Sequence, residues 1–211
     1  MNSSVESIVP FNQFIDSAQG DHLHGNRGGW LSEIKEKGRI EFYKLGWPSP
    51  KFESWRYTNL NKLAKTQFFL PQDIELAELP YQDILPVDAP KIALVNGKFN
   101  RELSDLSTIG EGILVNNFQE MSDEQRALFS LENPTTLPKE GLPVKALNDA
   151  ILSDVLFIEI RPGWQSDVPL HIVSIGCGDH VGFSSKIFVS AGEDCHLDIV
   201  ESHAGENGST Y

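Results

Sequence analysis

The chain has 211 residues, of which 40% are hydrophobic, as expected for a globular protein with one or two domains. Its formal net charge of −13 argues against binding to nucleic acid or to an anionic membrane surface. The sequence has no apolar run near the roughly 20 residues that a membrane helix needs, and its start lacks a secretory signal. The only two cysteines, Cys177 and Cys195, are typical of a reducing cytoplasm, with a single bridge between them left open.

Residues 1–90 are expected to form an N-terminal helical region followed by a connector. Apolar residues at helical spacing predict a first helix that starts near Pro10 and a second that runs from Trp30 to Leu45. Gly38 is a predicted weak point or break in the second helix. A short third helix is expected after Asn59, which can cap it. Residues 71–90 are rich in proline and acidic side chains and are interpreted as the connector.

An aromatic segment, residues 46–58, separates the second and third predicted helices. Pro48 and Pro50 prevent a helix there and favour extended backbone. Four large rings fall within the segment: Trp47, Phe52, Trp55 and Tyr57. Rings on irregular backbone are expected to bury against something, so the segment is predicted to anchor the helical lobe to the next domain. An aromatic-lined ligand groove is the alternative.

Residues 91–152 are expected to mix helices and strands. The run from Ile92 to Val95 predicts a strand, and the Asn96-Gly97 pair that follows it is a strong hairpin signal. Another short strand is predicted around Val115, after a turn at Gly110-Glu111-Gly112. Ser122 can cap a following helix, and a further helix is predicted over residues 144–152.

Residues 153–211 are expected to contain only strands. Alternating apolar residues predict four of them, around residues 155–160, 170–175, 187–191 and 196–199. This pattern is typical of a sheet with one buried face. The turn at Gly192-Glu193-Asp194 either closes an antiparallel hairpin or turns a β-helix corner. The chain stops at Tyr211 directly after a strand and a turn, so it is expected to be the front part of a longer protein.

Candidate metal ligands gather in the strand region without a tight metal-binding spacing. They are His171, His180, His196, His203, Cys177, Cys195, Asp194 and Asp198. A site built from facing strands is imaginable, but surface or hydrogen-bonded histidines are the favoured interpretation. His22 and His24, in a Gly-rich loop, are weaker candidates.

The residue patterns of common enzyme classes are missing from the sequence. It has neither a phosphate-binding Gly-rich loop nor a Gly-x-Ser-x-Gly nucleophile motif. Cys195 and His196 are neighbours on a predicted strand, so their side chains point to opposite faces, and both thiols are interpreted as buried and inert. Paired carboxylates such as Glu193 and Asp194 are interpreted as solvated. We therefore expect a scaffold or interaction protein without catalytic, cofactor or metal residues.

The run Pro50-Lys51-Phe52-Glu53-Ser54-Trp55-Arg56-Tyr57-Thr58 resembles the N-terminal signature of the SufB/SufD family, and more closely that of SufD. Later segments are also similar to this family, so that the resemblance runs from about residue 30 to the end. They are residues 93–99, 103–106, 147–150, 156–158, 161–163, 169–172 and 200–205.

The resemblance implies an N-terminal helical region followed by the start of a right-handed parallel β-helix. It implies the N-terminal portion of a SufD-like scaffold subunit of the SufBCD complex, which assembles iron–sulfur clusters in the cytoplasm. Its partners would be a SufB-like scaffold and a SufC-like ABC ATPase, contacted mainly through a C-terminal part that this chain lacks; a homodimer is left open. This portion would bind no cofactor, and Glu53, Trp55, Arg56, Tyr57 and Thr58 would be structural. A small cupin-like metal-binding enzyme that uses strand histidines is the alternative.

Overall fold

The computed structural model describes residues 9–19, 28–72, 74, 89–131 and 138–205. It is an α+β protein whose N-terminal part is helical, which confirms the predicted class. The chain forms two compact units that interleave along the sequence. The helical unit comprises residues 1–70 and 133–152, and the sheet unit comprises residues 71–132 and 153–211. The division predicted from the sequence, into 1–90, 91–152 and 153–211, stays a prediction.

The helical unit contains the predicted helices and two short 3₁₀ turns that the sequence did not predict. They are α1 (Val9–Gln19), α2 (Gly28–Leu45), the 3₁₀ turn η1 (Glu53–Trp55), α3 (Asn61–Lys65), the 3₁₀ turn η3 (Lys139–Gly141) and α5 (Leu142–Ala150). An aromatic cluster forms the core of this unit, with Trp47 at 4.8 Å from Phe11 and 5.4 Å from Phe42 between ring centroids. Edge-on contacts of this kind add to the hydrophobic gain from burial. The core therefore joins the first helix, the second helix and the start of the aromatic segment.

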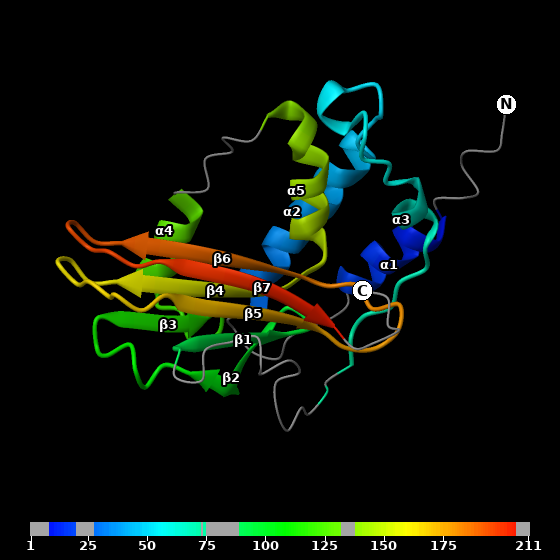
Figure 1. Cartoon of the computed structure of the whole chain (residues 1–211). Helices are drawn as coiled ribbons and strands as arrows, with labels where there is room; N and C mark the ends of the chain where they lie inside the picture. The colour runs from blue at the N-terminus through cyan, green and yellow to red at the C-terminus, as the bar shows by residue number, and fades with distance from the viewer. Residues whose placement is uncertain (1–8, 20–27, 73, 75–88, 132–137, 206–211) are drawn as a thin grey trace, which may run out of the picture. The chain divides into compact units, whose positions relative to one another are not determined.

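Helix α2 runs without interruption through Gly38, so a break there is excluded. Helix α5 lies alongside α2 (Figure 1), and a Cβ at position 38 would lie 2.5 Å from the Cβ of Asp149 and 2.6 Å from the backbone nitrogen of Ala150. The glycine is explained by this close approach of two helices, because no larger residue leaves room for the α5 backbone.

The sheet unit holds seven strands and one helix among its described residues. They are β1 (Lys91–Val95), β2 (Lys98–Asp105), β3 (Ile113–Asn117), α4 (Asp123–Leu131), β4 (Leu152–Ile160), β5 (Leu170–Gly176), β6 (Ser184–Ala191) and β7 (Ile199–Gly205). The strands form two sheets, with orders β2-β1-β5-β7 and β3-β4-β6 (Figure 1). The helix predicted over 144–152 is thus two residues shorter at its end, because Leu152 already belongs to β4.

Strands β1 and β2 form the predicted hairpin. Asn96 and Gly97 make its two-residue turn, with φ angles of 48° and 77°. Left-handed backbone at both turn positions matches the twist of the flanking strands, and asparagine and glycine adopt it at little cost. The Asn96 side chain accepts a hydrogen bond from the backbone N–H of Cys177 at 2.8 Å, which fixes the hairpin to the end of β5.

The last four strands do not form the single sheet that their alternation suggested. They alternate instead between the two sheets, with β4 and β6 in one and β5 and β7 in the other. Strands β5 and β7 pair in parallel from Leu170–Ile199 to Gly176–Gly205, a constant offset of 29 residues. The Gly192–Asp194 turn therefore connects two sheets rather than closing a hairpin.

The space between the two sheets is filled by aliphatic side chains. Strands β1, β4 and β5 contribute most of this core: Ile92, Leu94, Leu156, Ile158, Ile160, Leu170 and Ile172. The predicted shared face of Leu156, Ile158 and Ile160 is thereby confirmed. Strands β1 and β5 also bury their opposite faces, where Ala93, Val173 and Ile175 lie in a second cluster. A strand that is buried on both faces carries apolar residues at consecutive positions, which explains the continuous apolar run in β1.

Helix α4 begins with the reciprocal cap that its sequence predicts. The Ser122 hydroxyl accepts a hydrogen bond from the backbone N–H of Gln125 at 3.2 Å, and the Gln125 side chain accepts one from the N–H of Ser122 at 3.1 Å. We expect Ser122→Ala to lower the free energy of unfolding by about 1 kcal/mol, because a backbone donor loses its partner. Urea denaturation measures the loss. Ser130→Ala, at an exposed hydroxyl in the same helix, is the control and should change stability by less than about half as much. Equal losses in both variants would contradict the assigned cap.

Candidate functional site

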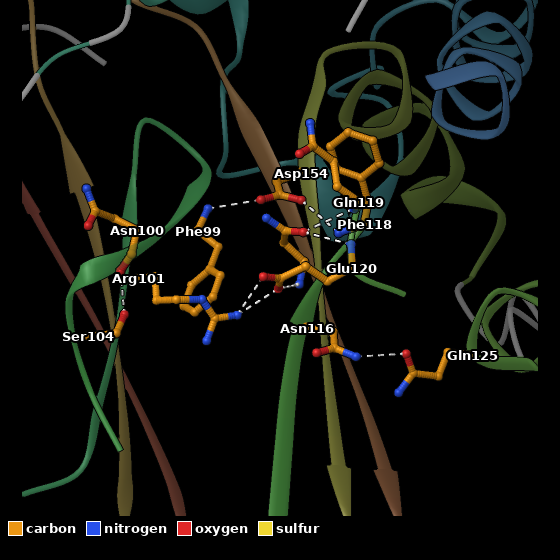
Figure 2. Close-up of polar contacts among 11 residues, drawn as sticks. Phe99, Asn100, Arg101, Ser104, Asn116, Phe118, Gln119, Glu120, Gln125 and Asp154 are labelled. Carbon is orange, nitrogen blue, oxygen red and sulfur yellow. Dashed lines mark hydrogen bonds and ion pairs between the residues drawn. The ribbon is translucent and has the colours of Figure 1, made fainter. Parts of the chain in front are cut away.

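Asp154, near the start of β4, joins three segments of the sheet unit through one buried carboxylate (Figure 2). The residue is only 4% exposed. Its Oδ1 accepts hydrogen bonds from the backbone N–H groups of Val155 at 2.7 Å and Phe118 at 3.3 Å, and its Oδ2 accepts one from Phe99 at 3.0 Å. Strand β2, the turn after β3 and strand β4 therefore meet at one side chain.

Burial raises the pKa of Asp154 to about 6, because a charged carboxylate is poorly solvated inside the protein. The three backbone hydrogen bonds favour the charged form and oppose this increase, whereas the nearby negative charge of Glu120 adds to it. Glu120 itself is held by Arg101, whose Nη2 lies 2.7 Å from Oε1 and 2.8 Å from Oε2 (Figure 2).

A second polar chain links helix α4 to the sheet. Gln125 accepts a hydrogen bond from the Asn116 side chain at 3.1 Å and donates one to Glu159 at 3.0 Å. These contacts connect β3, α4 and β4 and sit beside the Asp154 network. Both oxygens of Asp154 are occupied by backbone donors, so the arrangement fixes strand ends rather than presenting an acid or base to a substrate.

Sequence reasoning missed Asp154, although its position carried a signal. Asp154 lies an even number of positions from Leu156, Ile158 and Ile160, which the alternation places on one face of the strand. A carboxylate at an inward-facing strand position must find donors, because an unpaired buried charge is expensive. Which donors it finds depends on backbone groups 36 and 55 residues away, and the sequence pattern does not reveal them.

The candidate metal ligands are spread along the sheet unit. His171 is buried on β5, Cys195 packs against the core between the sheets, and His203 lies on β7 with its Nε2 at 3.4 Å from a Glu201 carboxylate oxygen. His196 forms an isolated parallel bridge with Gln165. Within the ranges that the structure describes, no three His, Cys, Asp or Glu side chains lie close enough to hold a metal ion.

Among the described residues, the other sequence candidates do not come together in a site. Cys177 and Cys195 are not joined by a disulfide, so the bridge left open above is not formed. Cys177 is buried, as predicted for both cysteines, whereas Cys195 is only partly so. His180 lies near its neighbour Asp179, and its backbone adopts a left-handed conformation in a turn. His22 and His24 lie outside the described residues.

A groove of about 500 Å³ runs beside the crossing of α2 and α5. Lys37, Ile40 and Glu41 line it from α2, and Lys145 lines it from α5. Lys145 is already paired with Asp149 at 2.8 Å, one helical turn away. The charged groups of this groove therefore neutralise one another in part, and they form no set typical of catalysis.

The aromatic segment is only partly buried, so the prediction that its rings are buried is wrong for Phe52 and Tyr57. Tyr57 is 89% exposed and Phe52 is 47% exposed. Trp47 packs in the helical core, and the Trp55 Nε1–H donates a hydrogen bond to the backbone oxygen of Glu140 at 2.7 Å. Successive backbone turns order the segment in place of ring burial, as in the hydrogen bonds from Phe52 to Ser49 and from Trp55 to Phe52.

Strand β7 lies at one end of the four-stranded sheet order. Its side chains are largely exposed, including those of Ile199 and Val200. Strand β5, the hydrogen-bonded neighbour of β7, is almost entirely buried. A strand at the end of a sheet that exposes apolar residues is a natural place for a further strand to add. The β7 edge is therefore the candidate interaction site of the sheet unit.

Comparisons with known proteins identify the family. None of the helices that the structure describes is long and apolar enough to cross a membrane. A search among curated proteins gave no significant match. The family described as the SufBD protein N-terminal region matches residues 12–172, which include the aromatic segment, the β1–β2 hairpin, Asp154 and the start of β5. The chain belongs to the SufB/SufD family, whose proteins serve the Suf system of iron–sulfur cluster assembly.

Proposed function

We propose that this chain is the N-terminal portion of a SufD-like scaffold subunit of the Suf complex. It acts in the cytoplasm beside a SufB-like scaffold and a SufC-like ABC ATPase, and it has no catalytic activity of its own. The cluster is the cargo of the whole complex, and this portion holds no cofactor. The family match supports the assembly role, and the aromatic signature at residues 53–58 favours SufD over SufB.

The observation that carries the proposal is the direct parallel pairing of β5 with β7, although β6, which comes between them in the sequence, belongs to the other sheet. The chain passes from one sheet to the other and then pairs with its own earlier strand at an offset of 29 residues. This is the connectivity of successive β-helix coils. The parallel bridge between Gln165 and His196 supports the same coil connectivity at a corner, with an offset of 31 residues. Crossover connections between parallel strands are right-handed in almost all proteins, so we infer a right-handed β-helix that continues beyond β7.

An affinity purification of the native protein from its own cells tests this function. The protein carries a tag on its chromosomal copy, and the purified material is analysed by mass spectrometry. We expect an ABC-type ATPase and a second SufB/SufD-family protein to copurify with it. An unrelated acidic protein with the same tag is the control for nonspecific capture, because the chain has a net charge of −13.

The two partner proteins must be enriched over the control in mild salt. If neither is enriched, the proposed place in the Suf complex is wrong. A solved structure in which β7 closes an antiparallel barrel would contradict the β-helix part of the proposal, since a barrel leaves no edge to which a further coil can add.

A further inference from the structure

Residues 51–65 form a basic segment, with exposed side chains, in an acidic protein. The segment contains four of the 17 basic residues of the chain, Lys51, Arg56, Lys62 and Lys65, but only one of its 30 acidic residues, Glu53. Its formal charge is thus +3, against −16 for the rest of the chain. All four basic side chains are exposed. A local excess of positive charge inside a strongly negative chain is not a solubility feature, because solubility is served by the overall net charge.

Apolar side chains are exposed in the same segment. Phe52 and Tyr57 come from the aromatic segment, and Leu63, which is 38% exposed, comes from α3. Together with Lys51, Arg56, Lys62 and Lys65, they define what we call the basic aromatic surface. Rings next to cations, with aliphatic groups nearby, have the composition of protein interfaces, where tyrosine, phenylalanine and arginine are enriched.

The cations of this surface are free to meet a partner. Across the described ranges, no carboxylate lies in ion-pair contact with Lys51, Lys62 or Lys65. The Arg56 guanidinium lies over a ring, with its carbon 5.6 Å from the centroid of Tyr57. Lys44, which precedes the segment, is by contrast paired with Glu41 at 3.5 Å. The absence of internal partners leaves the positive charge of residues 51–65 uncompensated within the described chain.

The surface is also held in shape before any partner binds. Backbone hydrogen bonds from Arg56 to Glu53 and from Thr58 to Trp55 continue the turns, and the Asn59 side chain accepts one from the N–H of Asn61 at 2.9 Å. The indole hydrogen bond of Trp55 to Glu140 ties the middle of the segment to the helical unit. An ordered surface loses little conformational entropy on binding, which favours affinity.

We propose that the basic aromatic surface docks an acidic polypeptide segment that also carries aliphatic side chains. Its carboxylates would pair with the four cations, and its apolar residues would cover Phe52, Tyr57 and Leu63. A polypeptide is favoured over nucleic acid because the remaining charge of −16 repels a long polyanion. This inference is independent of the Suf role proposed above.

Fluorescence anisotropy with the full chain tests this docking. The probe is a fluorescein-labelled peptide of alternating glutamate and leucine. We expect it to bind the wild type and to bind about tenfold more weakly to Lys51→Glu/Lys62→Glu, because two attractions become repulsions. Tyr57→Ala should weaken binding about fivefold through lost apolar contact. Since Tyr57 is almost fully exposed, this variant keeps the fold.

The control is Lys37→Glu/Arg161→Glu, which changes net charge equally at two exposed cations elsewhere and should change affinity less than about twofold. Circular dichroism establishes that each variant is folded. A peptide of alternating glutamate and serine should bind more weakly than the leucine peptide. The proposal is overturned if the peptide does not bind, or if both double variants weaken it equally. Tighter binding of a single-stranded DNA, or self-association that requires the same residues, would likewise overturn it by assigning the surface to another occupant.

Discussion

Replacing Gly38 by alanine is expected to lower the free energy of unfolding by about 3 kcal/mol, because the added methyl group overfills a helix crossing. Its Cβ would lie 2.6 Å from the backbone nitrogen of Ala150 and 2.8 Å from the backbone oxygen of Ala146. Backbone atoms of α5 can yield only if the helix moves as a whole. The clash exceeds the gain of about 1 kcal/mol that alanine normally brings to a helix interior.

Gly29→Ala in the same helix is the matched control. A Cβ at this position meets nothing within 4 Å, so the substitution should be neutral or stabilising by up to about 1 kcal/mol. Chemical denaturation of both variants and of the wild type gives the difference directly. A Gly38→Ala variant as stable as Gly29→Ala would show that α2 and α5 do not approach each other as closely as described.

Local chemistry explains what could be predicted from the sequence. The Asn96-Gly97 turn and the Ser122 cap depend on residues within a few positions of each other, and both appear as expected. Helical spacing likewise predicted α1, α2 and α5, since the period of apolar residues reflects the face that each helix buries. The aromatic signature was sufficient to indicate the family, which the match over residues 12–172 then showed.

Long-range pairing explains what could not be predicted. Alternation along β4 to β7 indicates strands but carries no information on which strands are neighbours, so one sheet was expected where two exist. Gly38 was interpreted from helix propensity alone, whereas its neighbour across the crossing is more than 100 residues away. Phe52 and Tyr57 were expected to be buried because ring burial is the usual source of order. Here backbone turns and one indole hydrogen bond supply that order instead.

The candidate sites show the same division between local sequence signals, which are predictable, and long-range contacts, which are not. The basic residues of the 51–65 segment are visible in the sequence, but their importance depends on their exposure and on the absence of ion-pair partners among the described residues. Asp154 could have been noted as a charge at an inward-facing strand position. Its three donors come from backbone N–H groups, which every residue except proline carries, so no residue type identifies them.

Asp154 should make the protein less stable as the pH rises from about 4 to about 7. Its pKa is about 6 in the folded protein, against an ordinary value of 3.8. A raised pKa in the folded state means that the folded protein binds the proton more tightly than the unfolded chain does. The resulting stability is fully present below the unfolded pKa and is lost as the pH passes through the folded pKa. The shift corresponds to about 3 kcal/mol between these two limits.

Asp154→Asn removes this titration and keeps a side chain of similar size. We expect the stability of the wild type relative to the variant to fall by about 2 kcal/mol between pH 4 and pH 7, in addition to any difference between the two proteins that does not depend on pH. Urea denaturation at half-unit pH intervals measures the difference. Other carboxylates that titrate in this range act in both proteins and cancel in the comparison.

Glu120→Gln tests whether the charge of Glu120 contributes to the raised pKa of Asp154. Its negative charge adds to the raised pKa of Asp154, so its removal should shift the pH-dependent loss to lower pH without abolishing it. Arg101 then loses its bidentate partner, but that exposed pair contributes little to stability. A stability difference between wild type and Asp154→Asn that stays constant with pH would mean that the Asp154 carboxylate is not desolvated. The fold would then rely on these three hydrogen bonds as ordinary surface contacts rather than as the junction of β2, β3 and β4.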